Sequence, residues 1–215
     1  MLTSAIEVFY KLPMKFFALA LISFLVLFNS AYSKSRLGEY YMGFGYAMAD
    51  GGKGADIEGD FLSLSANSPA SDSADFVLRF DYGSVDSNTS DDSTWELGLD
   101  YIYHYDDYVF QNGMFRPFAG GGISYLSDDA MVRMKKDGFT WKLLAGTEVL
   151  FTDYFSMSFG ANFLGLWSDF SQNDFSIDVG LTWWINDIHG VAFEYSHAFD
   201  QEVDFIGLKY LYSWQ

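Results

Sequence analysis

The sequence has no cysteine, only 3 prolines in 215 residues, and few basic side chains. Without cysteine, disulfide bonds and thiolate chemistry are excluded. The 12 Lys and Arg against 29 Asp and Glu give a formal net charge of −17, so the basic face that nucleic acid requires is missing and no nucleic-acid partner is expected. No motif for a cofactor or a metal ion is present, and we expect neither.

Long apolar runs are also missing, apart from one near the N-terminus. Lys15 precedes an apolar stretch over residues 16–28, and small residues follow at Ala31 and Ser33. This order is typical of a secretory signal peptide, and we expect cleavage after Ser33. An uncleaved membrane anchor is the alternative, but a span needs about 20 apolar residues and this stretch is shorter.

The expected mature chain is a single domain over residues 34–215, preceded by a signal peptide over 1–33. Met14 is followed by Lys and Phe and resembles a natural start, so residues 1–13 would be an over-extended start. Residues 1–33 hold two of the 12 basic and one of the 29 acidic residues, so the mature chain has 10 basic and 28 acidic residues.

The main pattern from Tyr40 to Trp214 is an alternation of apolar and polar residues in about ten short segments. In the clearest segment, Trp95–Tyr105, every odd position is large and lipophilic, whereas the even positions include Glu96, Asp100 and His104. A period of two places these sets on opposite faces of a strand. Aromatics make up 20% of the chain, enough to coat an outer surface. The pattern predicts a barrel that is apolar outside and polar inside.

We therefore predict an all-β fold: a closed antiparallel transmembrane β-barrel of about ten strands, with eight strands as the alternative. The expected strands are 39–49, 58–67, 75–83, 95–105, 115–125, 139–151, 155–166, 175–185, 191–199 and 203–214. With a periplasmic N-terminus, the outer loops would be 50–57, 84–94, 127–138, 167–174 and 200–203. Periplasmic turns are expected at 152–154 and 186–188, whereas 105–113 is long for such a turn.

Two segments carry a resemblance to a known class of protein. Residues 116–122 read Arg-Pro-Phe-Ala-Gly-Gly-Gly, and residues 206–214 alternate Ile, Leu, Tyr, Tyr and Trp. In this the chain resembles the small bacterial outer-membrane β-barrel proteins, the OmpA/OmpX/opacity-like porin-family barrels, although Gln215 follows the last aromatic. The resemblance implies a monomer in the outer membrane of a Gram-negative bacterium. Its partners would be outer-membrane lipid, lipopolysaccharide and, during insertion, the barrel-assembly machinery.

The inward positions of the predicted strands carry a set of charged side chains. The acids are Glu39, Asp75, Asp81, Glu96, Asp100, Glu148, Asp178 and Glu194, and the bases are Arg79, Arg116, Lys142 and Lys209. Charge in a narrow lumen must be paired or hydrated. Salt bridges that fill the lumen explain most of the set, but eight acids against four bases leave four carboxylates without a strong partner. Those four suggest either raised pKa values or a water-filled, cation-preferring conduit.

Catalysis is not expected, because no histidine has a suitable setting. Outer-membrane lipid A deacylases use His with Ser two positions later, whereas Ser196 here precedes His197, which we place on the outward face. Omptin proteases need Asp/Asp and Asp/His pairs at the outer rim. The one Asp-x-His, formed by Asp187 and His189, falls in a turn at the opposite end. His104 is placed inward, near the periplasmic side.

The loops hold carboxylate groups that could bind calcium or magnesium, although solvated loop charge is the simpler explanation. These groups are Asp91-Asp92, Asp128-Asp129 and Asp200-x-Glu202-x-Asp204. Loop 127–138 is the only basic outer loop and could contact lipopolysaccharide phosphates or a partner.

The sequence is thus compatible with three functions. The first is a non-enzymatic outer-membrane scaffold, structural or surface-interacting, that displays acidic extracellular loops. A narrow cation-preferring porin-like channel is the alternative, and a lipid-modifying enzyme or protease is the third.

Overall fold

The computed structural model describes residues 34–51, 57–87, 91–105, 114–129, 132, 134 and 136–214. The signal peptide expected over residues 1–33 lies outside the described residues, so its cleavage stays a prediction. Ten strands are described: β1 (Tyr41–Gly51), β2 (Ile57–Ser71), β3 (Ala74–Ser87), β4 (Asp91–His104), β5 (Phe115–Asp128), β6 (Gly138–Thr152), β7 (Phe155–Leu166), β8 (Asn173–Trp184), β9 (His189–Ala198) and β10 (Val203–Ser213).

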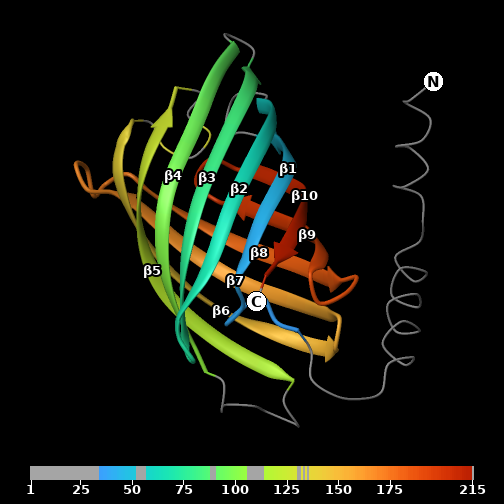
Figure 1. Ribbon diagram of the computed structural model, residues 1–215. Coiled ribbons are helices and arrows are strands. Elements are labelled where there is room, and N and C mark those ends of the chain that lie inside the picture. Colours follow the sequence, from blue (N-terminus) through green and yellow to red (C-terminus); the bar gives the residue numbers. More distant parts are fainter. Residues whose placement is uncertain are drawn as a thin grey trace, which may run out of the picture.

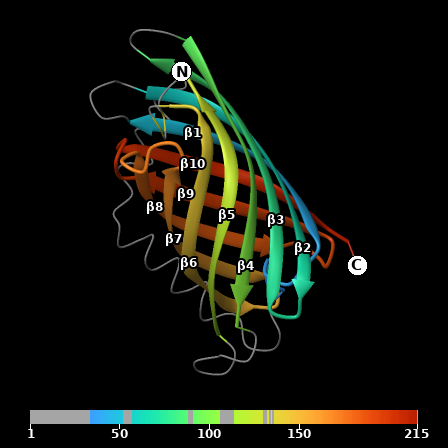
Figure 2. The same ribbon diagram turned by 90° about the vertical axis from the view of Figure 1, so that its left-hand side faces the viewer.

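The strands form one closed antiparallel barrel (Figures 1 and 2). Each strand pairs with its neighbours in sequence, and β1 closes onto β10 from Tyr41 opposite Ser213 to Gly51 opposite Val203. The prediction of ten strands is confirmed, and the alternative of eight is wrong. Closure gives every strand two hydrogen-bonded neighbours and removes the sheet edges. Among the described residues, no helix is long and apolar enough to cross a membrane.

The outward face of the barrel is apolar along the middle of the strands. Phe44, Leu62 and Leu208 are 51%, 61% and 60% exposed on neighbouring strands. Aromatic side chains lie outward near both ends, for example Tyr40 beside Trp214 at one end. A continuous apolar surface of this size would be costly in water, and it suits lipid contact with aromatic girdles at the interfaces.

The two ends of the barrel differ. Residues 34–40 and Trp214 lie at one end, which we call the termini end, and the opposite end is called the loop end (Figure 1). The tight turns expected at 152–154 and 186–188 are found at the termini end. Of the connection expected over 105–113, residues 106–113 lie outside the described residues.

One predicted loop, 84–94, is wrong in its bounds. β3 continues to Ser87 and β4 begins at Asp91, with Val85 opposite Asp92 in the ladder. The alternation of apolar and polar residues ends before the Val85–Asp92 pair, because the side chains beyond it no longer lie at the level of the apolar outer surface of the barrel. Backbone pairing continues nonetheless, since the established register keeps the two strands aligned. The β3–β4 hairpin therefore extends the barrel wall at the loop end (Figure 1).

The glycine run of β5 permits a close approach between strands. A Cβ placed on Gly120 would clash with the carbonyl oxygen of Tyr101 and lie 3.0 Å from the Cα of Ile102, both on β4. A Cβ on Gly122 would clash with the Asp100 carboxylate. The bare backbone thus lets β5 pack against β4 and leaves room for the Asp100 side chain inside the barrel.

Candidate functional site: the barrel lumen

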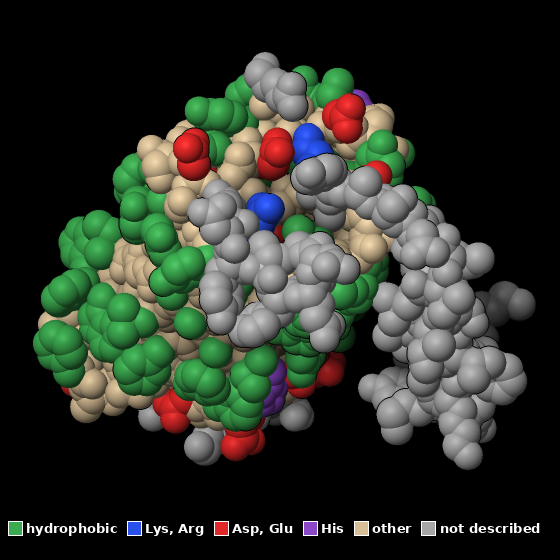
Figure 3. All heavy atoms as spheres, turned by 90° about the horizontal axis from the view of Figure 1, so that it is seen from below, with side chains coloured by type: hydrophobic (Ala, Val, Ile, Leu, Met, Phe, Trp, Pro, Cys, Tyr) green, Lys and Arg blue, Asp and Glu red, His purple; other side chains and the backbone are tan. Residues whose placement is uncertain are grey.

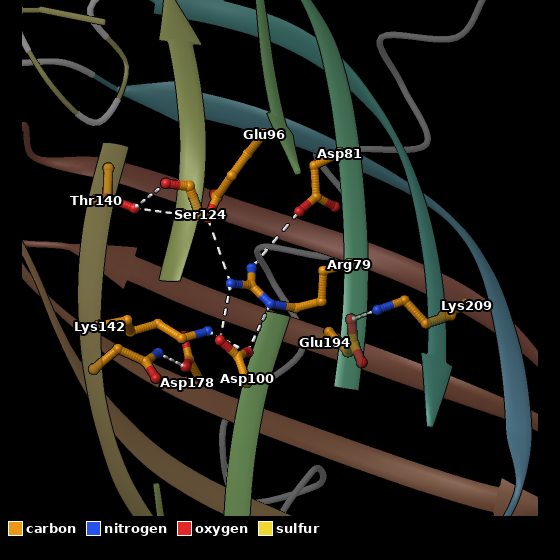
Figure 4. Close-up of polar contacts among 11 residues, drawn as sticks. Arg79, Asp81, Glu96, Asp100, Ser124, Thr140, Lys142, Asp178, Glu194 and Lys209 are labelled. Atoms are coloured by element: carbon orange, nitrogen blue, oxygen red, sulfur yellow. Dashed lines mark hydrogen bonds and ion pairs between the residues drawn. The ribbon is translucent and has the colours of Figure 1, made fainter. Parts of the chain in front are cut away.

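The centre of the lumen holds an ion-pair cluster around Arg79 of β3 (Figure 4). The Arg79 Nε donates to Asp100 Oδ2 at 2.8 Å, and Nη2 lies 3.4 Å from Glu96 Oε1. Its Nη1 lies 3.9 Å from Asp81 Oδ2 on the same strand. From β6, Lys142 Nζ donates to Asp100 Oδ2 at 2.6 Å. Two cations thus neutralise carboxylates that lie side by side on β3 and β4.

A second cluster lies on the wall formed by β9 and β10. Lys209 Nζ donates to Glu194 Oε2 at 2.8 Å, as Figure 4 shows. The other oxygen of Glu194 accepts from Arg36 Nη1, also at 2.8 Å. Lys34 Nζ lies 3.8 Å from Glu39 Oε2. Arg36 and Lys34 belong to the segment before β1, so this segment enters the lumen.

Glu148 of β6 binds the same N-terminal segment on another part of the wall. It is 3% exposed and accepts hydrogen bonds from the Ser35 hydroxyl, from Ser156 Oγ at 2.9 Å and from the Arg36 backbone N–H at 3.3 Å. Arg116, opposite Glu148 in the β5–β6 ladder, donates to the Leu37 carbonyl at 3.4 Å. The barrel wall therefore holds the segment by its backbone as well as by its side chains.

The remaining predicted carboxylates accept hydrogen bonds from neutral donors or lie beside a histidine. Asp75, fully buried on β3, accepts from the Gly38 backbone N–H at 2.9 Å and lies 3.4 Å from His104 Nε2. Asp178 of β8 accepts from the side-chain amide of Asn162 on β7. All eight acids thus have a partner, and five of them pair with Lys or Arg: Glu39, Asp81, Glu96, Asp100 and Glu194. The expectation that four carboxylates would lack a strong partner left out Lys34 and Arg36, which precede the first strand.

Sequence reasoning missed these partners for two reasons. Lys34 and Arg36 precede the first periodic strand, and no alternation marks a segment that folds into a lumen. Asn162 and His104 carry no charge pattern that would assign them to a particular carboxylate.

Seen from the termini end, acidic and basic side chains gather at this end, and hydrophobic side chains cover the outer wall (Figure 3).

At the loop end the interior is apolar rather than polar. One buried cluster joins side chains from β1, β2, β3 and β10 with Val132 of the β5–β6 connection, and Phe205 packs against it. The members of this loop-end cluster are Ala49, Ile57, Phe61, Val85, Val132 and Val203. Phe61 and Phe205 meet edge to face, with ring centroids 5.4 Å apart. Apolar side chains thus occupy the part of the lumen that lies against β1, β2, β3 and β10 at the loop end.

The opposite wall carries a second buried cluster, formed by Leu126, Met134 and Leu166. Asp128, one of the loop carboxylates considered for a metal ion, holds this region in place. It is 3% exposed, and its two oxygens accept from the backbone N–H groups of Val132 at 3.1 Å and Met134 at 3.0 Å. Within the described residues, no group of three acidic or histidine side chains has the spacing to hold a metal ion.

Between the two ends lies a cavity of about 420 Å³. Most of the twelve charged residues predicted from sequence line it: Arg79, Asp81, Glu96, Asp100, Lys142, Glu148, Asp178, Glu194 and Lys209. Glu39, Asp75 and Arg116 are not among the residues that line it. The lumen is therefore a charged chamber with an apolar layer at one end and a chain segment at the other.

The histidines lie where the sequence predicts. His104 is buried inside the barrel near the termini end, and His189 begins β9 at that end. His197 faces outward at the loop end, where its Nδ1 lies 2.9 Å from Asp204 Oδ1. Ser196 lines the cavity on the other face of β9, so the wall separates its hydroxyl from the His197 ring.

No protein-family model and no curated relative matches the sequence. Among solved structures, the KdgM porin in complex with disordered oligogalacturonate is 11% identical, with a TM-score of 0.42 over 81% of this chain and 99% of that one. Neisserial surface protein A is 12% identical, with a TM-score of 0.42 over 81% and 97%. The translocator domain of the autotransporter NalP from Neisseria meningitidis is 10% identical, with a TM-score of 0.45 over 94% and 95%. Sequence identities and TM-scores this low say nothing about what this chain binds or does.

Proposed function

We propose that this chain is a non-enzymatic integral protein of the bacterial outer membrane, a scaffold whose closed barrel holds acidic loops at the cell surface. One observation carries the proposal: inward-packed side chains and a chain segment occupy the lumen at its two ends. Val132 and the loop-end cluster fill one end, and the segment around Arg36 fills the other. A barrel closed in this way serves as a mount rather than as a conduit.

The outer surface supports the placement in the membrane. At the loop end, outward-facing carboxylates lie directly opposite one another on adjacent strands, as Asp204 faces Asp50 and Asp50 faces Glu58. Charges of this kind are excluded from hydrocarbon, so this rim lies at the level of the lipid headgroups. Outer-membrane lipid and lipopolysaccharide would surround a monomeric barrel, inserted by the barrel-assembly machinery with the termini end in the periplasm.

A narrow cation-preferring channel is the second candidate, because the cavity is lined by more acids than bases. Its weakness is the loop-end cluster, since an apolar constriction expels water and blocks ions. For Arg133 and Lys135 of the basic loop, which lie outside the described residues, contact with lipopolysaccharide phosphates stays a prediction.

Thiol accessibility distinguishes the scaffold from the channel, because the chain has no native cysteine. Ser65→Cys places a thiol in the lumen, where Ser65 Oγ is buried, and Asp200→Cys places one on an exposed loop. We expect a bulky, membrane-impermeant maleimide to label the Ser65→Cys protein on the order of a hundredfold more slowly than the Asp200→Cys protein in liposomes. Equal labelling rates would mean an open lumen and would favour the channel.

A further inference from the structure

The segment before β1 docks on the turn between β6 and β7 as well as in the lumen. The backbone N–H of Lys34 donates to the Asp153 carbonyl at 2.8 Å. The Lys34 side chain is fixed separately: its Nζ donates to the Asp187 carbonyl and to Ser213 Oγ at 3.1 Å, and it lies 4.6 Å from the centroid of a Trp184 ring. The backbone nitrogen of residue 34 therefore has a defined position beside Asp153.

The side chain of the same aspartate is left with an unsatisfied oxygen. Asp153 Oδ1 is buried, and within the part of the chain that the structure describes it has no hydrogen-bond partner. A buried carboxylate oxygen without a donor is costly, because it has lost water and gained nothing in return. Lys34 has only one backbone N–H while the chain continues before it, and that N–H is already given to the Asp153 carbonyl.

We propose that Asp153 is the binding site for the α-ammonium group that signal-peptide cleavage creates at Lys34. The inference rests on the proposed outer-membrane function, since only an exported chain is cleaved. Hydrolysis of the Ser33–Lys34 bond by a signal peptidase consumes one water, leaves a carboxylate on Ser33 and frees an amine on Lys34 that takes up a proton. The single N–H at residue 34 becomes three donors and a positive charge, which can serve both the Asp153 carbonyl and its buried carboxylate oxygen.

This binding couples processing to closure of the barrel. The residues that follow Lys34 carry the contacts that fill the termini end, through Ser35, Arg36 and Gly38. An ammonium held by Asp153 fixes the start of this segment and so lowers the cost of ordering the rest. The unprocessed chain lacks the ammonium charge at Lys34, so its N-terminal segment is held less tightly in the termini end of the barrel.

A double-mutant cycle tests the inference on refolded chains of residues 34–215. One parent begins at Lys34 with a free amine, and the other carries one extra Gly before Lys34, which moves the ammonium away by one residue. Each is made with Asp153 and with Asp153→Asn. Asp72→Asn is the matched control, because Asp72 is an exposed aspartate in the β2–β3 turn at the same end. The readout is the rate at which the folded band converts to the unfolded band on SDS gels at a fixed temperature.

We expect the Gly extension and Asp153→Asn each to raise that rate on the order of tenfold. Together they should raise it no further, because both remove one interaction. Asp72→Asn should leave the rate unchanged. Additive effects, or an equal effect of Asp153→Asn in the extended chain, would overturn the inference.

N-terminal sequencing of the protein from the outer-membrane fraction completes the test, with Lys34 as the expected first residue. A membrane protein that begins at another residue would overturn the inference for the native chain and leave the scaffold proposal intact. A protein absent from the outer membrane would overturn the proposed function itself, whereas the refolded chains would still report on Asp153.

Discussion

At the scale of single residues, the lumen obeys the rule that charge in a low-dielectric interior is paired. The inward position of residues such as Glu96 and Asp100 was predictable, because a period of two leaves no other face for them. Their partners were not predictable. Arg36 lies outside any periodic segment, and the choice between Lys142 and another cation depends on how the strands are staggered around the barrel.

Charge reversal at Lys142 tests the central ion-pair cluster. Lys142→Glu places a carboxylate beside Asp100 and Glu96, so we expect the free energy of unfolding to fall by about 3 kcal/mol. The measurement is the temperature at which the folded band disappears on SDS gels. Lys136→Glu is the control, because its Nζ meets Asp169 at an exposed site where the side chain of Lys136 is 60% exposed. If the folded bands of the two variants disappeared at the same temperature, water would be screening the charges in the lumen.

The loop carboxylate Asp169 gives a prediction for acid pH. Hydrogen bonds from the Ser171 hydroxyl and from Lys136 lower its pKa from 3.8 to about 2. Because the folded loop favours the ionised form, the contribution to stability is complete above pH 3.8 and is lost as the pH falls through 2. A carboxyl NMR titration should give a midpoint near 2, and Ser171→Ala should raise it. A midpoint at 3.8 in both proteins would contradict these contacts.

At the scale of elements, the strands were predictable to within a few residues wherever aromatic residues alternate. The exceptions are informative. The β3–β4 hairpin is longer than predicted because hydrogen bonding continues beyond the lipid-facing band. Val132 and Met134 lie in a polar loop sequence, where nothing distinguishes a side chain that folds into the lumen from one that faces water.

The contact between β4 and β5 can be tested at its glycines. Gly120→Ala would push a methyl group into the backbone of β4, and we expect it to lower the free energy of unfolding by about 2 kcal/mol or more. Gly160→Ala on β7 is the matched control, since its Cβ would lie 3.7 Å from the Ala145 carbonyl, at ordinary contact distance. Urea unfolding in detergent measures both. A Gly120→Ala protein as stable as the Gly160→Ala protein would show that the strands are not this close.

At the scale of the whole molecule, the barrel combines a lipid-facing exterior with a lumen closed by different means at its two ends. Apolar packing fills the loop end, and the N-terminal segment fills the termini end with ion pairs. The exterior follows directly from the sequence alternation. Closure does not, because it depends on two segments that carry no periodic signal.

Ion conductance of the refolded protein in a planar lipid bilayer tests this closure most directly. We expect no stable conducting steps for residues 34–215. We also expect conductance that favours cations once Val132→Asp wets the loop-end cluster and Arg36→Ala removes a cation from the termini end, since the lining then retains its acids. Steady, cation-selective steps from the unaltered protein would contradict the closed scaffold and establish the channel in its place.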